Sequence, residues 1–183
     1  MKLAFIGAHC SGKSTLIKAL AEIIPSSDLY VIHGIVRKII AKGFPMGKCT
    51  TVDSLLNYLA AQLSCEQEAS ATGCIHVFSD RTVADALAYT LTNRRLGYGN
   101  LPAFLADTLA QVWELEQSRY DACIYCPPEF PIVPDGIRDN DDAYRAEVDA
   151  EFRSLLGGFK VDIVMVGGTV NERLNTVRSY LRL

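Results

Sequence analysis

Eight consecutive residues near the start of the sequence, Gly7 to Ser14, have the types and spacing of a phosphate-binding loop. They match the pattern GxxxxGKS in full and lie between a short apolar run and a helical pattern. There the glycines let the backbone curl, so that successive N–H groups point at phosphate oxygens at the positive end of a helix. We expect Lys13 to reach the β- and γ-phosphates of a nucleotide and the Ser14 hydroxyl to coordinate Mg²⁺. The residues expected to bind the nucleotide are Gly7, Ala8, His9, Cys10, Ser11, Gly12, Lys13, Ser14 and Thr15.

A second charged pair, Asp80 and Arg81, follows the third apolar run of the chain. In an open α/β sheet this end of a strand faces the ligand. Asp80 could hold Mg²⁺ or accept the proton of an attacking hydroxyl, and the alternative is a helix N-cap or a surface ion pair. Thr82 and Asp85 already have the spacing of a capping box, which gives Asp85 a structural role. We therefore favour a site role for Asp80.

The elements that must position these groups follow from five short apolar runs, which alternate with segments of helical periodicity. We expect strands at residues 2–6, 29–33, 75–79, 122–126 and 161–166. Nearly every residue in these runs is apolar, which is typical of a parallel sheet covered by helices on both faces. The sequence predicts a single three-layer α/β domain over residues 1–183, built on a five-stranded parallel sheet.

Two more pairs with capping-box spacing, Thr50 with Asp53 and Thr169 with Glu172, mark expected helix starts. The helix from Thr50 has apolar residues at helical spacing that we expect to face the core: Val52, Leu55, Leu56, Leu59, Ala60 and Leu63. The proline-rich and polar stretch after residue 126 is too long for a minimal connection. We expect it to form a lid over about residues 127–145.

Composition and charge narrow the function further. The 183 residues carry 18 basic and 21 acidic side chains, a net charge of −3, which disfavours a general nucleic-acid or membrane-surface binder. No apolar run approaches the ~20 residues that span a bilayer, and the apolar stretch after Met1 is too short for a signal peptide. We therefore expect a cytoplasmic protein with reduced cysteines. The pair Cys123 and Cys126 lies in a strand pattern and is expected in the core, not at a zinc or redox site.

These motifs resemble the AAA-type P-loop kinase family, which includes ribosylnicotinamide kinases and is similar to thymidylate and deoxynucleoside kinases. The resemblance rests on the phosphate loop, on the block D-R-x3-D-x3-Y that begins at Asp80, and on the segment D-G-I-R that ends at Arg138. It implies a P-loop kinase fold, ATP with Mg²⁺, and a hydroxyl or phosphate as acceptor. It also implies that Arg81 lies near the acceptor or the transferred phosphoryl group, and that arginines of the lid close over the nucleotide.

In three regions that carry arginines, the sequence leaves the role of the residues open. Gly34 stands where relatives often carry a glutamate three residues before an arginine, here Arg37, so the acceptor is in question. Arg138 is the better candidate for a lid arginine, and we expect Arg145 to lie on a solvated helix face. Arg94 and Arg95 end a helix and could contact an acceptor phosphate or offset the helix dipole.

The sequence thus predicts an ATP-dependent kinase that transfers the γ-phosphoryl group to a nucleoside, nucleotide or nucleobase hydroxyl. Lys13, Asp80, Arg81 and Arg138 are the expected catalytic residues, and Ser14 and Asp80 the expected metal ligands. One alternative, suggested by viral relatives, is a kinase of 5-hydroxymethyluracil in DNA during thymidine hypermodification. Another is a nucleotide-dependent switch NTPase. We expect no membrane partner.

Overall fold

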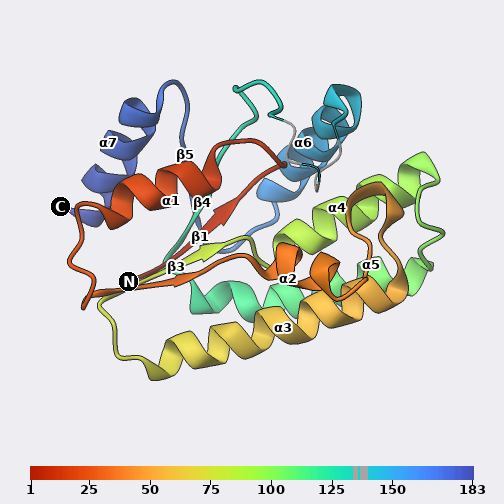
Figure 1. Ribbon diagram of the computed structural model, residues 1–183, viewed down its shortest axis with the longest axis horizontal. Coiled ribbons are helices and arrows are strands. Elements are labelled where there is room, and N and C mark those ends of the chain that lie inside the picture. The colour runs from red at the N-terminus through yellow and green to blue at the C-terminus, as the bar shows by residue number, and fades with distance from the viewer. Residues whose placement is uncertain (134–135, 137–139) are drawn as a thin grey trace.

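The chain forms a five-stranded sheet in which every strand runs parallel to its neighbours (Figure 1). The computed structural model describes residues 1–133, 136 and 140–183. The strands lie in the order β2-β3-β1-β4-β5, so the first strand of the chain is the central one. Their bounds are β1 Lys2–Ile6, β2 Leu29–Ile32, β3 His76–Asp80, β4 Ala122–Tyr125 and β5 Asp162–Met165. All five predicted strands are confirmed, each within one residue at either end.

Helices cover both faces of this sheet, which makes three layers. Leu3 and Phe5 of β1 pack in the cluster formed with α1 and α7, whereas Ala4 and Ile6 face the opposite cluster under α2 to α6. Figure 1 shows α1 and α7 on one side of the sheet and α3 and α5 on the other. The helices are α1 Lys13–Ala21, α2 Ile35–Ala41, α3 Val52–Ala71, α4 Val83–Leu96, α5 Ala103–Glu116, α6 Asp142–Leu156 and α7 Val170–Leu181, with short 3-10 turns at Gly47–Cys49 and Gln117–Arg119.

Two of the three predicted capping boxes are present, and the prediction of the third is wrong. Thr82 begins α4 and Thr169 begins α7, each with its acidic partner three residues on. Helix α3 instead takes Thr51 as its N-cap, and the Thr50 hydroxyl donates to the Gly47 carbonyl at 2.7 Å. Thr50 is therefore used by the preceding turn, which shifts the start of the helix by one residue.

The buried face of α3 is more polar than its periodicity predicts. Leu55 is buried as expected, but Leu56 is exposed, and Gln62 and Glu66 lie on the inner face. These two polar side chains take part in a hydrogen-bond network that is described below. A pattern of apolar residues alone could not reveal it, because both are residue types that usually lie in solvent.

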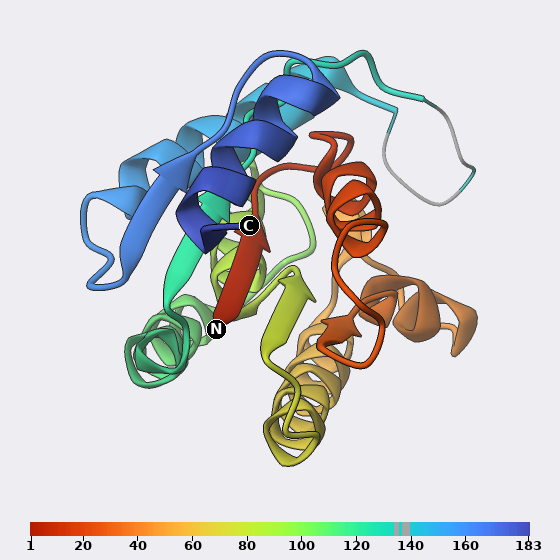
Figure 2. The same cartoon turned by 90° about the vertical axis from the view of Figure 1, so that its left-hand side faces the viewer.

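The carboxyl edge of the sheet is where the loops expected to bind ligand come together. Figure 2 shows β1 and β3 side by side, with their arrowheads at the same edge. Of the expected lid, residues 127–133 and 140–141 have no regular structure, and α6 begins at Asp142. Arg138 lies outside the described residues.

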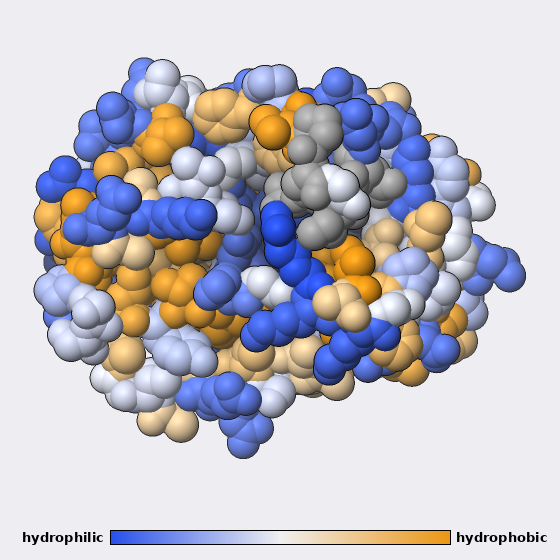
Figure 3. Space-filling view, in the orientation of Figure 1, coloured by the Kyte–Doolittle hydropathy of each residue, from blue (hydrophilic) through white to orange (hydrophobic). Residues whose placement is uncertain are grey.

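On the face of the molecule shown in Figure 3, hydrophilic and hydrophobic residues are interspersed. No helix in the described part of the chain is long and apolar enough to cross a membrane. Cys123 and Cys126 are buried in the sheet region, as predicted, and their thiols are free.

Candidate active site

The phosphate-loop motif forms the turn between β1 and α1, and its two glycines are required by close contacts. Gly7 and Gly12 have φ angles of 137° and 85°, which favour glycine. A Cβ atom at Gly7 would collide with the Cys126 carbonyl, and one at Gly12 would lie 2.8 Å from the Phe130 ring. The loop is thus packed between the end of β4 and the segment that follows it.

Lys13 is buried at the centre of this loop. Its ammonium group donates to the carbonyls of Gly7 and Ala8, both at 2.7 Å, and to the Ser11 hydroxyl at 3.1 Å. Burial and, to a smaller extent, the nearby positive charge of Arg81 lower the pKa of Lys13 to about 8. The site therefore holds a cation that an incoming phosphate would stabilise.

Ser14 and Asp80 are brought together at the mouth of the loop, although they are 66 residues apart in the sequence. The Ser14 hydroxyl donates to Asp80 Oδ2 at 2.5 Å. A hydroxyl and a carboxylate are the hard oxygen donors that Mg²⁺ takes, and this ion usually completes its shell with waters and phosphate oxygens. The pair fits such an ion, and the described residues contain no group of three or more His, Cys, Asp or Glu that could hold a metal by itself.

Arg81 has an unusual backbone conformation directly after β3. Its φ of 85° lies in the left-handed region, which a bulky residue rarely adopts. The side chain lies 3.5 Å from Asp85 Oδ1 and packs over the Tyr89 ring, with its guanidinium carbon 5.4 Å from the ring centroid. Burial alone would lower the pKa of Arg81, but Tyr89, Asp85 and Asp80 raise it above the usual value, so Arg81 is a fixed positive charge.

Asp85 has two roles, of which sequence reasoning found one. Its Oδ2 accepts from the Thr82 backbone N–H at 2.9 Å and completes the predicted capping box. Its other oxygen faces Arg81, and the residue lines a cavity. Burial raises the pKa of Asp85 to about 6, although the positive charges of Arg81 and Lys13 act in the opposite direction.

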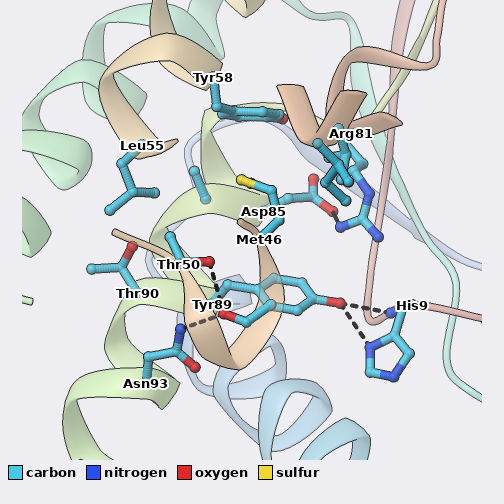
Figure 4. A pocket seen from close by; sticks show the side chains of 14 residues that line it. His9, Met46, Thr50, Leu55, Tyr58, Arg81, Asp85, Tyr89, Thr90 and Asn93 are labelled. Atoms are coloured by element: carbon cyan, nitrogen blue, oxygen red, sulfur yellow. Dashed lines mark hydrogen bonds and ion pairs between the residues drawn. The ribbon is translucent and has the colours of Figure 1, made fainter. Parts of the chain in front are cut away.

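Arg81 lines two spaces, a cleft and a smaller cavity. A cleft of about 880 Å³ runs along the phosphate loop and reaches Asp80, Arg81 and Phe130, with His33 exposed at its rim. Arg81 also lines the smaller cavity, of about 70 Å³ (Figure 4). Its lining is mostly apolar or aromatic, with Asp85 and Asn93 among the polar groups: the other members include His9, Met46, Thr50, Leu55, Tyr58, Tyr89 and Thr90.

Tyr89 connects the cavity to the phosphate loop, a contact that sequence reasoning missed. Its hydroxyl accepts from the His9 backbone N–H at 2.8 Å and lies 3.0 Å from His9 Nδ1. Arg81, Asp85 and Tyr89 are spaced four residues apart, so α4 places Asp85 and Tyr89 on one side. The D-R-x3-D-x3-Y spacing in the sequence was the signal that could have identified the whole group.

The prediction that Arg145 lies on a solvated helix face is wrong. Its guanidinium is buried and donates to the Phe130 carbonyl at 2.7 Å and to Asp142 at 2.6 Å. Arg145 therefore joins the two sides of the segment expected to act as a lid. Arg95 lies on the surface and pairs with Glu147 and Glu151 of α6, at 2.9 and 3.8 Å, which neither sequence interpretation foresaw.

Arg173 of α7 is a further buried cation that the sequence did not single out. It donates to the carbonyl of Ser11 in the phosphate loop at 2.7 Å and to that of Gly168 at 3.1 Å. It also pairs with Glu129 at 2.8 Å and packs over the Phe130 ring, 4.5 Å from its centroid. One side chain thus holds together three loops at the edge of the sheet.

Comparisons with known proteins agree on the architecture. A family model described as an AAA domain matches residues 2–173. Similar solved structures include thymidylate kinase from Candida albicans (TM-score 0.69, 17% identity, 99% of this chain and 90% of that one) and deoxyadenosine kinase from M. mycoides with bound dATP (0.73, 14%, 100% of each). The NadR protein in complex with NR aligns with a TM-score of 0.78 and 18% identity over 100% of this chain and 52% of that one. No curated protein matches the chain significantly.

Proposed function

The chain belongs to the AAA domain family and has the fold of the P-loop kinases, and we propose that it is an ATP-dependent phosphotransferase. The proposed reaction transfers the γ-phosphoryl group of ATP to a hydroxyl of a nucleoside, nucleotide or nucleobase. The observation that carries this proposal is that Arg81 lines both spaces, the phosphate-loop cleft and the smaller cavity. A cation in that position can stabilise charge on a phosphoryl group that passes from one side to the other.

On the ATP side of the site, different residues would bind the phosphates and the metal ion. The loop N–H groups and Lys13 would hold the phosphates, while Ser14 and Asp80 would hold Mg²⁺. When bound, this ion would neutralise negative charge on the phosphates. Asp80 is also proposed to accept the proton of the attacking hydroxyl, and the Mg²⁺ dependence of Asp80→Asn separates its two roles.

On the acceptor side, the small cavity would take the group that carries the hydroxyl. Tyr58 and Tyr89 offer aromatic faces, and Asp85 and Asn93 offer polar groups that can orient a ring. Arg138, in the segment between Phe130 and α6, is proposed to close over the nucleotide as a lid arginine. The fold similarity to thymidylate kinase and deoxyadenosine kinase supports this class of acceptor.

Measuring ATP turnover against a panel of acceptors tests the proposal. The panel contains nucleosides, nucleoside monophosphates and a DNA oligonucleotide with 5-hydroxymethyluracil, and products are identified by mass spectrometry. We expect ADP formation to depend on a free nucleoside or nucleotide and to yield its phosphorylated form. A product formed on the oligonucleotide alone would favour the DNA-base kinase instead. ATP hydrolysis that ignores every acceptor would favour a switch NTPase.

The lowered pKa of Lys13 predicts how ATP binding depends on pH. Phosphates favour the charged ammonium, so binding raises this pKa from about 8, and a proton is taken up. Affinity for ATP should therefore be highest below pH 8 and fall as the pH rises above it. Titration calorimetry between pH 7 and 9.5, in two buffers that differ in ionisation enthalpy, measures both effects. Lys13→Arg, whose charge does not titrate in this range, should lose the dependence, and a wild-type affinity that stays constant would contradict the prediction.

Asp85 predicts an acidic limb in the activity profile. Its carboxylate is ionised above a pKa of about 6 and protonated below it, so its pairing with Arg81 weakens as the pH falls through 6. We expect kcat/KM for the acceptor to fall on that side. Asp85→Asn keeps an oxygen for the Thr82 N–H but removes the charge, so kcat/KM should drop about tenfold and the limb should disappear. Asp107→Asn, on an exposed position of α5, is the control, and a limb that survives in Asp85→Asn would assign it to another group.

A further inference from the structure

The backbone at Arg81 must be held in place by its surroundings, because the conformation is unfavourable for a residue with a large side chain. With φ at 85°, the chain turns sharply between β3 and α4. Such conformations persist where neighbouring groups fix the backbone. The Arg81 N–H donates to the Phe5 carbonyl at 3.1 Å, which fixes one side of the turn. The carbonyl side needs a second set of partners.

That second set comes from β3 and from the polar inner face of α3. The Arg81 carbonyl accepts from the Ser79 hydroxyl at 2.8 Å, and the Gln62 amide nitrogen lies 3.3 Å away. The next carbonyl, that of Thr82, accepts from the Tyr58 hydroxyl at 3.1 Å. The two peptide groups that follow Arg81 are therefore held by side chains.

Glu66 contacts the donors of this network, Gln62 and Ser79, and orients them. Its carboxylate accepts from the Gln62 amide at 2.8 Å and from the Tyr120 hydroxyl, and it also pairs with Lys2. The Gln62 amide has two protons, and its second lies toward the Ser79 oxygen at 3.1 Å. The Ser79 hydroxyl has two acceptors within reach, the Arg81 carbonyl at 2.8 Å and Glu66 Oε1 at 3.1 Å, and the contact to the carbonyl is the shorter. The Gln62 amide thus donates to Glu66 on one side and to Ser79 on the other, and the Ser79 hydroxyl donates to the turn.

Stability alone does not account for this network. A buried carboxylate loses its hydration, and a buried ion pair often stabilises a protein no more than apolar residues of the same volume would. Glu66 is 1% exposed, and neither Glu66 nor Gln62 nor Ser79 lines the small cavity. Their hydrogen bonds reach the site at the Arg81 carbonyl, through Ser79 and Gln62, and at the Tyr58 hydroxyl, which donates to the Gln62 oxygen at 3.3 Å. Ser79 contacts the first of these and not the second, so its effect on the reaction is expected to pass through the backbone of Arg81.

We propose that Glu66, Gln62 and Ser79 are positioning residues that hold Arg81 in its left-handed turn and so aim its guanidinium at the transferred phosphoryl group. This inference rests on the proposed kinase function. A displacement of about 1 Å at a reacting centre can cost up to about 10²-fold in rate. Ground-state binding of ATP depends on the phosphate loop and does not use this network.

The test compares Ser79→Ala with Thr92→Val, which removes another fully buried hydroxyl that donates to a backbone carbonyl, that of Ala88 at 2.9 Å. We expect Ser79→Ala to lower kcat between about tenfold and 10²-fold, with KM for ATP unchanged within twofold. Thr92→Val should keep the wild-type kcat. Gln62→Met serves as a second variant of the network in case Ser79→Ala does not fold.

A double-mutant cycle separates positioning from a general structural effect. In an Arg81→Ala background, Ser79→Ala should cost nothing further, since no guanidinium remains to be aimed. Equal losses of kcat in both backgrounds would overturn the proposal, as would a full kcat in both Ser79→Ala and Gln62→Met.

A spectroscopic measurement does not depend on the kinase function. The ¹⁵N-detected Nε–H signal of Arg81, assigned with Arg81→Lys, should shift or broaden in Ser79→Ala and stay unchanged in Thr92→Val. If the wild type transfers no phosphoryl group to any acceptor, the proposed function fails, and this signal still decides whether the network positions Arg81. An Arg81 signal that is identical in Ser79→Ala and wild type would overturn the inference.

Discussion

Lys13→Ala should reduce phosphoryl transfer by about 10³-fold or more and weaken ATP binding, while the protein stays folded. The ammonium group lies inside the phosphate loop, where it donates to Gly7, Ala8 and Ser11, and in the proposed complex it would contact the β- and γ-phosphates. Burial works against this charge, as its lowered pKa shows, so replacing it removes a cost to folding as well as three hydrogen bonds. We therefore expect a small change in thermal stability and a large change in function.

Three measurements check this expectation: the ATP dissociation constant, turnover with the best acceptor, and the melting temperature. Lys13→Met, which keeps most of the aliphatic volume, separates the loss of charge from the loss of packing. Lys42→Ala, at an exposed position just after α2, is the matched control. If Lys13→Ala binds and turns over ATP as the wild type does, the proposed kinase function is wrong.

Asp80→Asn is expected to lower kcat by roughly 10²-fold or more, because it keeps the shape of the side chain and removes its charge. The carboxylate accepts from the Ser14 hydroxyl at 2.5 Å, so the asparagine can preserve one contact while it loses the capacity to take up a proton or to hold a divalent cation. The melting temperature should change little, since Asp80 lies partly exposed at the end of β3.

The dependence of this loss on Mg²⁺ concentration separates the two roles proposed for Asp80. If the carboxylate helps to hold the ion, Asp80→Asn should need more Mg²⁺ for half-maximal activity, and excess Mg²⁺ should restore part of the rate. If it acts as the base, the concentration for half-maximal activity stays the same and the rate does not recover. Asp107→Asn again serves as the control, and a kcat that survives in Asp80→Asn would make Asp80 structural.

The parts of the fold that sequence could predict are those determined by neighbouring residues. The five strands are continuous apolar runs, and the phosphate loop is a single local motif whose glycines, lysine and serine are needed together. The capping boxes at Thr82 and Thr169 are equally local, since both partners lie within one helical turn. For such features the pattern and the structure depend on the same few residues.

The buried charged residues could not be predicted, because their partners lie far away in the sequence. Arg145 and Arg173 look like residues of solvated helix faces, yet the carbonyls and carboxylates of the loops surround their guanidinium groups. Glu66 pairs with Lys2, 64 positions earlier, through the packing of α3 under the sheet. In each case the tertiary fold supplies the hydrogen bonds that make burial of a charge tolerable.

The position of β1 in the sheet and the contact of Arg173 with the phosphate loop determine when the nucleotide site can form during translation. The phosphate loop is translated among the first residues, but β1 is the central strand, and its neighbours β3 and β4 emerge much later. The Ser11 carbonyl of the loop also lacks its partner until Arg173, 162 residues further along the chain, has been synthesised. Nucleotide binding should thus be a late event of synthesis, and a nascent chain that lacks α7 should expose an unfinished site to chaperones before it can capture ATP.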